Sequence, residues 1–73
     1  MLELIATDGL NVIIGRNRWP LEFIKYYHFL DELPQVKLQF ADNSTRICRY
    51  NLIHWRKLHT ALVHSTARQN LDL

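Results

Sequence analysis

Three histidines, His54, His59 and His64, recur every five residues and are the first candidates for metal chemistry. Two histidines that bind one zinc ion from the same helix are spaced by four residues, which places both rings on one face. A step of five residues instead turns each ring by about 140° from the previous one. The spacing argues against a metal site, and we expect neither a metal nor another cofactor.

Cys48 is the only cysteine, and with any of the histidines it would formally make a pair of nucleophile and base. A single cysteine in a strand of a small protein is, however, more often a compact core residue. Gly9 and Gly15 are too far apart to form a phosphate-binding loop. Asp31 and Glu32 are adjacent, so they would face different ways on a helix. We therefore expect that the protein is not an enzyme.

The distribution of charge favours binding over catalysis. The net charge is only +2, but residues 1–42 carry four Lys or Arg against six Asp or Glu, whereas residues 43–73 carry five against one. Tyr50 and Trp55 lie among these C-terminal cations, a composition that is typical of sites that hold phosphates and stack bases. An acidic or mixed protein surface would suit the same arginines equally well, and so would an ordinary solvated face.

The candidate partner-binding residues form two groups. Arginine is prominent in both because its guanidinium pairs with carboxylate or phosphate in a bidentate fork. One group surrounds the N-terminal hairpin and the first helix that the pattern predicts, and the other belongs to the electropositive C-terminal segment. The groups are Arg16, Arg18 and Phe29, and Arg46, Arg49, Arg56 and Lys57.

The segment 19–34, WPLEFIKYYHFLDELP, is the element that we expect to organise the chain. Pro20 suits the first turn of a helix and Pro34 cannot continue one, so we predict a helix between them. Its large apolar residues gather on one broad helical face, which we expect to pack on a sheet. Phe29 falls away from the centre of that face, either as a contact at its rim or as an exposed anchor for a partner.

A β-hairpin is predicted at the start of the chain. The apolar runs 2–6 and 10–14 flank Asp8-Gly9, and an Asp-Gly pair between such runs favours a tight turn. Residues 15–18 are polar, and we expect them to be a connector into the helix.

A second hairpin is predicted from the alternating residues 36–40 and the returning segment 45–50. The alternation in the second segment is imperfect, because Arg46 and Arg49 cannot both point outward while Ile47 points inward. Either a β-bulge or an arginine that lies across the sheet face with its stem buried would resolve this conflict.

The C-terminal helix is expected over residues 52–65, with Asn51 as its cap. Residues 66–73 lose the helical periodicity, and we expect a flexible tail there. The fold class is therefore a small α+β single domain over residues 1–65, of order β-β-α-β-β-α, in which antiparallel hairpins pack on the central aromatic helix. With 48% hydrophobic and 22% charged residues, the chain has the composition of a folded domain.

A cytoplasmic location is expected from three features. The N-terminus lacks the basic segment of a secretion signal, no apolar run reaches membrane-spanning length, and a lone cysteine is typical of a reducing compartment. We also expect a monomer without a membrane partner.

From LELIATDGLNVIIG through RNRWPLEFIKYYHFLDELP to LIHWRKLHTALVHS, the chain resembles the small early transcription regulators of lytic Xanthomonas bacteriophages. The resemblance covers total length and general character, and it assigns no functional residue. It implies a non-enzymatic protein that binds host RNA polymerase near the N-terminus of the β′ subunit, inhibits initiation by displacing the σ factor, and acts as an antiterminator. The alternative is a small nucleic-acid-binding accessory protein that uses a basic C-terminal face, and a small enzyme or metal protein is a weaker third hypothesis.

Overall fold

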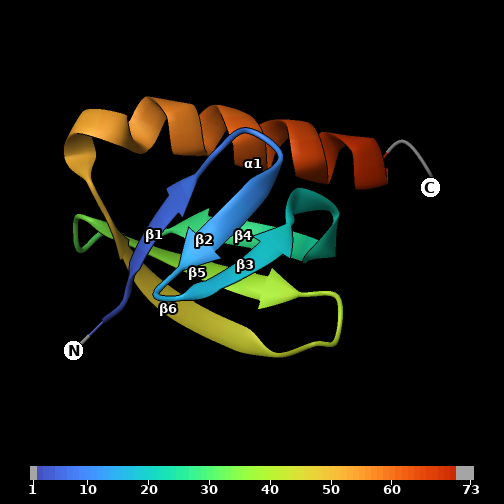
Figure 1. Ribbon diagram of the computed structural model, residues 1–73, viewed down its shortest axis with the longest axis horizontal. Coiled ribbons are helices and arrows are strands. Elements are labelled where there is room, and N and C mark those ends of the chain that lie inside the picture. Colours follow the sequence, from blue (N-terminus) through green and yellow to red (C-terminus); the bar gives the residue numbers. More distant parts are fainter. Residues whose placement is uncertain (1, 71–73) are drawn as a thin grey trace.

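The computed structural model describes residues 2–70, with side chains as far as Ser65 (Figure 1). It contains six strands, two short 3₁₀ turns and one α-helix. In chain order these are β1 (Leu4–Thr7), β2 (Asn11–Ile14), β3 (Asn17–Pro20), η1 (Leu21–Phe23), β4 (Ile24–Phe29), β5 (Gln35–Phe40), β6 (Thr45–Tyr50), η2 (Leu52–His54) and α1 (Trp55–Asn70).

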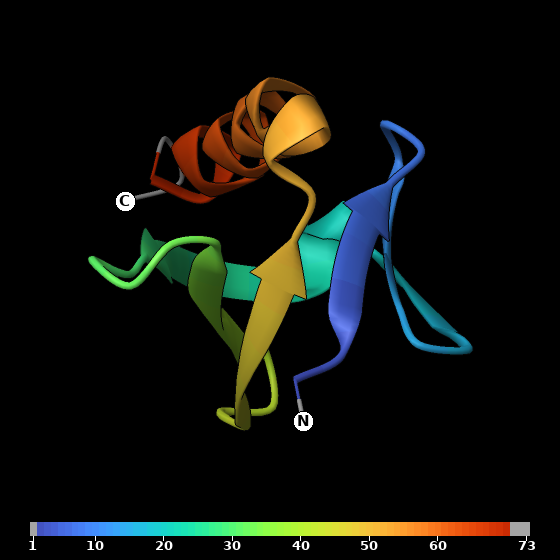
Figure 2. The same cartoon turned by 90° about the vertical axis from the view of Figure 1, so that its left-hand side faces the viewer.

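All six strands form one mixed sheet in the order β3-β2-β1-β6-β5-β4. Two antiparallel meanders, β1 to β3 and β4 to β6, join through the parallel pair β1 and β6. Helix α1 covers one face of this sheet (Figures 1 and 2). The α+β class is confirmed, but a six-stranded sheet with one helix replaces the expected β-β-α-β-β-α order.

The predicted helix of residues 19–34 is wrong, because Ile24–Phe29 form strand β4. A shift in register lies between Ile24 and Tyr26, so the alternation of the strand is interrupted there. Ile24 and Tyr27 consequently both turn toward the core although they are three residues apart, a spacing that imitates one turn of a helix. Aromatic and β-branched residues also favour strands over helices.

The first hairpin is confirmed, but the polar connector of residues 15–18 is wrong. Gly15 has φ +61° and begins a two-residue turn, after which Asn17–Pro20 pair with β2 as strand β3. Glycine adopts the positive φ that such a turn needs at its first position, and the backbone twist of the turn then matches the right-handed twist of the flanking strands. Pro20 ends this edge strand, where a missing N–H leaves no partner unsatisfied.

The second hairpin is also confirmed, and the structure resolves the conflict in its returning strand. Arg46 and the buried Cys48 turn toward the core side of the sheet, whereas Ile47 and Arg49 point outward. The β5–β6 pairing is in continuous register. An arginine that lies across the sheet is therefore the correct alternative, because the Arg46 guanidinium carbon lies 5.2 Å from the centre of the Trp19 ring.

Asn51 is confirmed as the cap before the C-terminal helix, since its side chain accepts a 3.0 Å hydrogen bond from the Ile53 N–H. The turn η2 follows, and α1 then runs to Asn70, five residues beyond the expected end. Of the predicted tail 66–73, residues 66–70 continue α1 and residues 71–73 lie outside the described residues. No described helix has both the length and the apolarity to cross a lipid bilayer.

The hydrophobic core lies between α1 and the sheet. The strands contribute buried aliphatic residues at alternate positions, and α1 contributes one stripe along its length. Trp19 from β3 reaches Phe40 on β5 with ring centroids 5.4 Å apart, so the two halves of the sheet curve toward each other. The helix stripe consists of Leu58, Ala61 and Leu62.

Candidate functional site

The three histidines with five-residue spacing do not meet. His59 packs among aromatic rings at the α1–β4 interface, whereas His54 and His64 are exposed on another side of the helix. Among the residues that the structure describes, no group of three or more His, Cys, Asp or Glu side chains could hold a metal ion.

Cys48 is fully buried in the core, next to Val36 on the neighbouring strand. Burial disfavours the charged thiolate and raises the pKa of the thiol to about 11, although the nearby Arg46 opposes this shift. The thiol is therefore protonated at neutral pH and enclosed by apolar side chains, which is the environment of an inert core cysteine.

Phe29 is a packing residue between β4 and α1. Its ring meets the rings of Tyr50, His59 and Trp55 edge-on, with centroids 5.2, 5.4 and 6.3 Å apart. Tyr27 joins the same cluster at 5.7 Å. Of the two interpretations of Phe29, the structure therefore favours a contact within the protein over an exposed anchor for a partner.

Arg46 is also engaged within the protein. Its guanidinium forms a 3.1 Å ion pair with Glu3 and lies over the Trp19 ring. Both charged side chains are partly exposed, so the ion pair adds little to stability. The arrangement nevertheless directs Arg46 away from Arg49, on the opposite face of β6.

The remaining sequence-predicted residues fall on separate parts of the surface. Arg16 is exposed in the β2–β3 turn, and Arg18 and Arg49 point outward from the sheet. Arg56 and Lys57 belong to α1, on the other side of the molecule. Arg46, Arg49 and the pair Arg56 and Lys57 thus lie on different parts of the surface.

The face of the sheet opposite α1 is not covered by any described element, and we call it the outer sheet face (Figure 2). Residues that pair across neighbouring strands share a face, and this rule defines its members from the register. Pairing places Lys37 between His28 and Ile47, and Arg49 beside Leu4. The face consists of Leu4, Ala6, Ile13, Arg18, Tyr26, His28, Lys37, Ile47 and Arg49, with neutral polar residues between them.

The outer sheet face contains three permanent cations and no carboxylate. Every acidic residue in the described chain lies in a turn or loop, in η1 or just before β1, and none lies within a strand. The side chains of Lys37 and Arg49 form no hydrogen bond or ion pair with any described residue. The acidic residues are Glu3, Asp8, Glu22, Asp31, Glu32 and Asp42.

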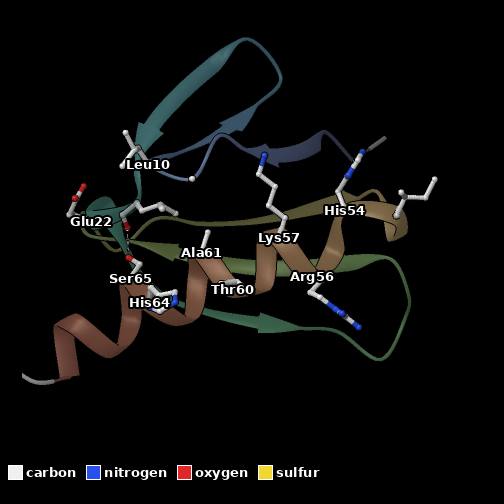
Figure 3. A pocket seen from close by; sticks show the side chains of 12 residues that line it. Leu10, Glu22, His54, Arg56, Lys57, Thr60, Ala61, His64 and Ser65 are labelled. Carbon is white, nitrogen blue, oxygen red and sulfur yellow. Dashed lines mark hydrogen bonds between the residues drawn. The ribbon is translucent and has the colours of Figure 1, made fainter.

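A second feature is an open groove of about 920 Å³ beside α1, which we call the helix groove (Figure 3). Leu21 and Ala61 form its apolar floor, and the exposed Leu10 and Ile53 stand at its margins. Lys57 points across it toward the β1–β2 hairpin. The other lining residues are Gly9, Glu22, His54, Arg56, Thr60, His64 and Ser65.

Two hydrogen-bonded contacts fix the walls of the helix groove. Ser65 donates a 2.6 Å hydrogen bond to the carbonyl of Leu21, which holds α1 against η1. Asp8 accepts bonds from the Leu10 and Asn11 N–H groups at 2.9 and 2.8 Å, and these bonds hold the pKa of its carboxyl below the ordinary value. The Asp8 side chain therefore stabilises the turn that carries Leu10.

Sequence reasoning missed several members of both surfaces. The sequence predicts Tyr26 and His28 in a helix, so their position near Lys37 on one face of the sheet could not be predicted. Glu3 lies in the run 2–6 that the sequence predicts as a strand, so the absence of acidic residues from the strands becomes visible only when the structure begins β1 at Leu4. Leu10 and Ile53 come together only through the packing of α1 against the first hairpin, which no local pattern predicts.

Comparisons of the chain with protein-family models, with curated proteins and with solved structures find no match.

Proposed function

We propose that this protein is a non-enzymatic, phage-type transcription regulator that docks on the host bacterial RNA polymerase through its outer sheet face. The observation that supports the proposal is the open, cationic, carboxylate-free face of the sheet, centred on Lys37 and Arg49. Cations that have no partner within the protein are available for an acidic surface. The resemblance to early phage regulators supplies the polymerase as the partner.

The composition of the outer sheet face suits a protein partner. Leu4, Ile47 and Tyr26 are 45%, 43% and 49% exposed, so apolar contact area lies among the cations. Such a mixture of aromatic and aliphatic groups with arginine is typical of protein interfaces. In this proposal the face binds near the N-terminus of the β′ subunit, displaces the σ factor and thereby inhibits initiation, and the same contact supports antitermination.

Nucleic acid is the second candidate partner of the same face. Tyr26 and His28 project from one strand and offer rings for stacking beside Lys37. Three cations that neutralise three phosphates would give a slope of about −2 to −3 in a plot of log affinity against log salt concentration. A single-stranded oligonucleotide therefore tests this alternative directly.

The test is a binding titration of the labelled protein with purified host RNA polymerase, as core enzyme and as holoenzyme, combined with an initiation assay. We expect binding, release of the σ factor and loss of initiation. The double substitution Lys37→Glu/Arg49→Glu should weaken binding at least about tenfold, because it places carboxylates where the partner is acidic. Lys57→Glu on α1 is the matched control and should retain binding.

Three results would overturn the proposal or its details. An absence of binding to polymerase even at low salt excludes the polymerase as partner. Binding that the Lys37→Glu/Arg49→Glu protein retains in full excludes the outer sheet face. Binding of single-stranded RNA or DNA with the steep salt slope, in place of polymerase, selects the nucleic-acid alternative.

A further inference from the structure

We infer that the helix groove is a docking site for a short amphipathic helix of a partner protein, with acidic residues flanking its apolar stripe. The groove lies beside α1, on a different side of the molecule from the outer sheet face (Figure 3). The helix groove is therefore a second, separate surface, and its binding does not depend on what the outer sheet face binds.

Exposed apolar side chains identify this groove as a contact surface. Ile53 and Leu10 are 84% and 76% exposed, the highest values among the large hydrophobic residues of the described chain. Both are at the margins of a groove whose floor, Leu21 and Ala61, is itself apolar. Exposed aliphatic groups around an apolar floor are the usual features of a site that buries a hydrophobic stripe.

The charge of the lining residues indicates which side chains should flank the apolar stripe of the partner helix. Lys57 points across the groove, Arg56 lies at its outer rim, and His54 and His64 add further N–H donors. Glu22 is the one carboxylate among the described lining residues. An occupant with acidic side chains beside its apolar stripe is complementary to this arrangement, whereas a basic one would be repelled by Lys57 and Arg56.

The backbone around the groove favours a helix over an extended peptide. The lining residues of the groove belong to the β1–β2 turn, η1, η2 and α1, and none lies in a strand, so the groove offers no strand edge with which an extended peptide could pair. An extended peptide on the apolar floor would leave its own N–H and C=O groups without partners, whereas a helix satisfies them internally. The lining runs along the helix side from Ile53 to Ser65, a length of about 18 Å, which matches a partner helix of about 12 residues.

A nucleic acid fits the groove less well than such a helix. Its phosphates would meet Lys57, but the sugar and phosphate backbone would cover Leu10, Ile53 and Leu21 with polar groups and leave these side chains without apolar contacts. An amphipathic peptide buries the same three residues and pairs its carboxylates with Lys57 in one pose.

The experiment is a selection of displayed helical peptides of about 12 residues against the immobilised full-length protein, followed by affinity measurement of the selected peptides in solution. We expect peptides with apolar residues at helical spacing of three and four and with Asp or Glu beside them. Leu10→Ser and Ile53→Ser alter exposed residues, so the fold should persist, and each should weaken binding by about fivefold to tenfold. Lys57→Glu should weaken the binding of acidic peptides. It should not weaken the binding of charge-reversed versions of these peptides.

Lys37→Glu on the outer sheet face is the matched control and should bind the selected peptides as the unaltered protein does. Amide chemical shifts should change around Leu10, Leu21 and Ala61. The inference is overturned if no helical peptide is selected, if the selected peptides lack acidic residues, or if Leu10→Ser and Ile53→Ser bind them unchanged. It is also overturned if the shifts map to the outer sheet face or if an oligonucleotide occupies the groove more tightly than any peptide.

Discussion

The Ser65 hydroxyl donates a buried 2.6 Å hydrogen bond to the carbonyl of Leu21, forty-four residues earlier in the chain. The same carbonyl also accepts the N–H of Ile24 at the end of η1. One oxygen therefore joins the turn that separates the two halves of the sheet to the helix that covers both halves. The bond closes the end of the helix groove opposite Ile53 (Figure 3).

Replacing Ser65 with Ala should lower the free energy of unfolding by about 1 kcal/mol, because the Leu21 carbonyl loses one of two donors but keeps the other. Urea unfolding followed by circular dichroism measures the change. Thr60→Ala, an exposed polar residue on the same helix, is the control and should change stability by less than about 0.5 kcal/mol. Equal effects of the two substitutions would contradict the structural role of the Ser65 bond.

Phe29→Ala should lower the free energy of unfolding by about 2–4 kcal/mol, since it removes the ring that touches Tyr50, His59 and Trp55. Thermal unfolding is a suitable measurement. Leu33→Ala, at a side chain that is 66% exposed, is the control and should have little effect. If Phe29→Ala left stability unchanged but weakened partner binding, Phe29 would be an exposed anchor after all.

Arg46 and Arg49 should behave differently although they are three residues apart. Arg46→Ala removes the contact with Trp19 and the ion pair with Glu3, and we expect a loss of about 1 kcal/mol in the free energy of unfolding. Arg49→Ala should leave stability within about 0.5 kcal/mol and instead weaken binding to the partner of the outer sheet face. Chemical denaturation and a binding titration of both variants separate the two roles. A loss of stability in Arg49→Ala together with a loss of binding in Arg46→Ala would contradict this assignment.

Cys48 should make stability depend on pH in the alkaline range. Its pKa is about 11 in the folded protein and 9.0 in the unfolded chain, so above pH 9 the unfolded chain releases a proton that the folded protein keeps. Stability that is complete below pH 9 is therefore lost as the pH rises toward 11, by about 2–3 kcal/mol in total.

The measurement for Cys48 is urea unfolding at several pH values between 8 and 11, with Cys48→Ala as the comparison. Cys48→Ala should be less stable at neutral pH, because it leaves a small cavity in the core. Its stability should then fall less steeply above pH 9, since only the unaltered protein carries the thiol. Parallel pH profiles for the two proteins would show that burial does not shift the thiol pKa.

Local chemistry in the sequence determined several elements of this protein. Asp8-Gly9 specifies the first hairpin, and the alternation of residues 36–40 specifies a strand with one buried face. Asn51 caps the turn η2 that leads into the C-terminal helix, and its position can be predicted because capping involves only the next few residues.

Only the tertiary structure decided whether the segment from Trp19 to Pro34 forms a helix or strands. Pro20 is acceptable both at the start of a helix and at the end of an edge strand, and the bulge in β4 gives apolar residues a helix-like spacing. Pairing with β5 selects the strand conformation, because β5 supplies backbone hydrogen bonds that cannot be predicted from the local sequence of β4.

The binding surfaces depend on the tertiary structure for the same reason. The parallel pairing of β1 with β6 brings Leu4 beside Arg49, and the packing of α1 on the first hairpin brings Ile53 and Leu10 to one groove. These contacts join residues about forty or more positions apart, whereas propensity, capping and turn chemistry act over only a few residues. The sequence by itself therefore determined the hairpins, the cap and the types of side chain that are available. The long-range pairing decided which of these side chains share a surface.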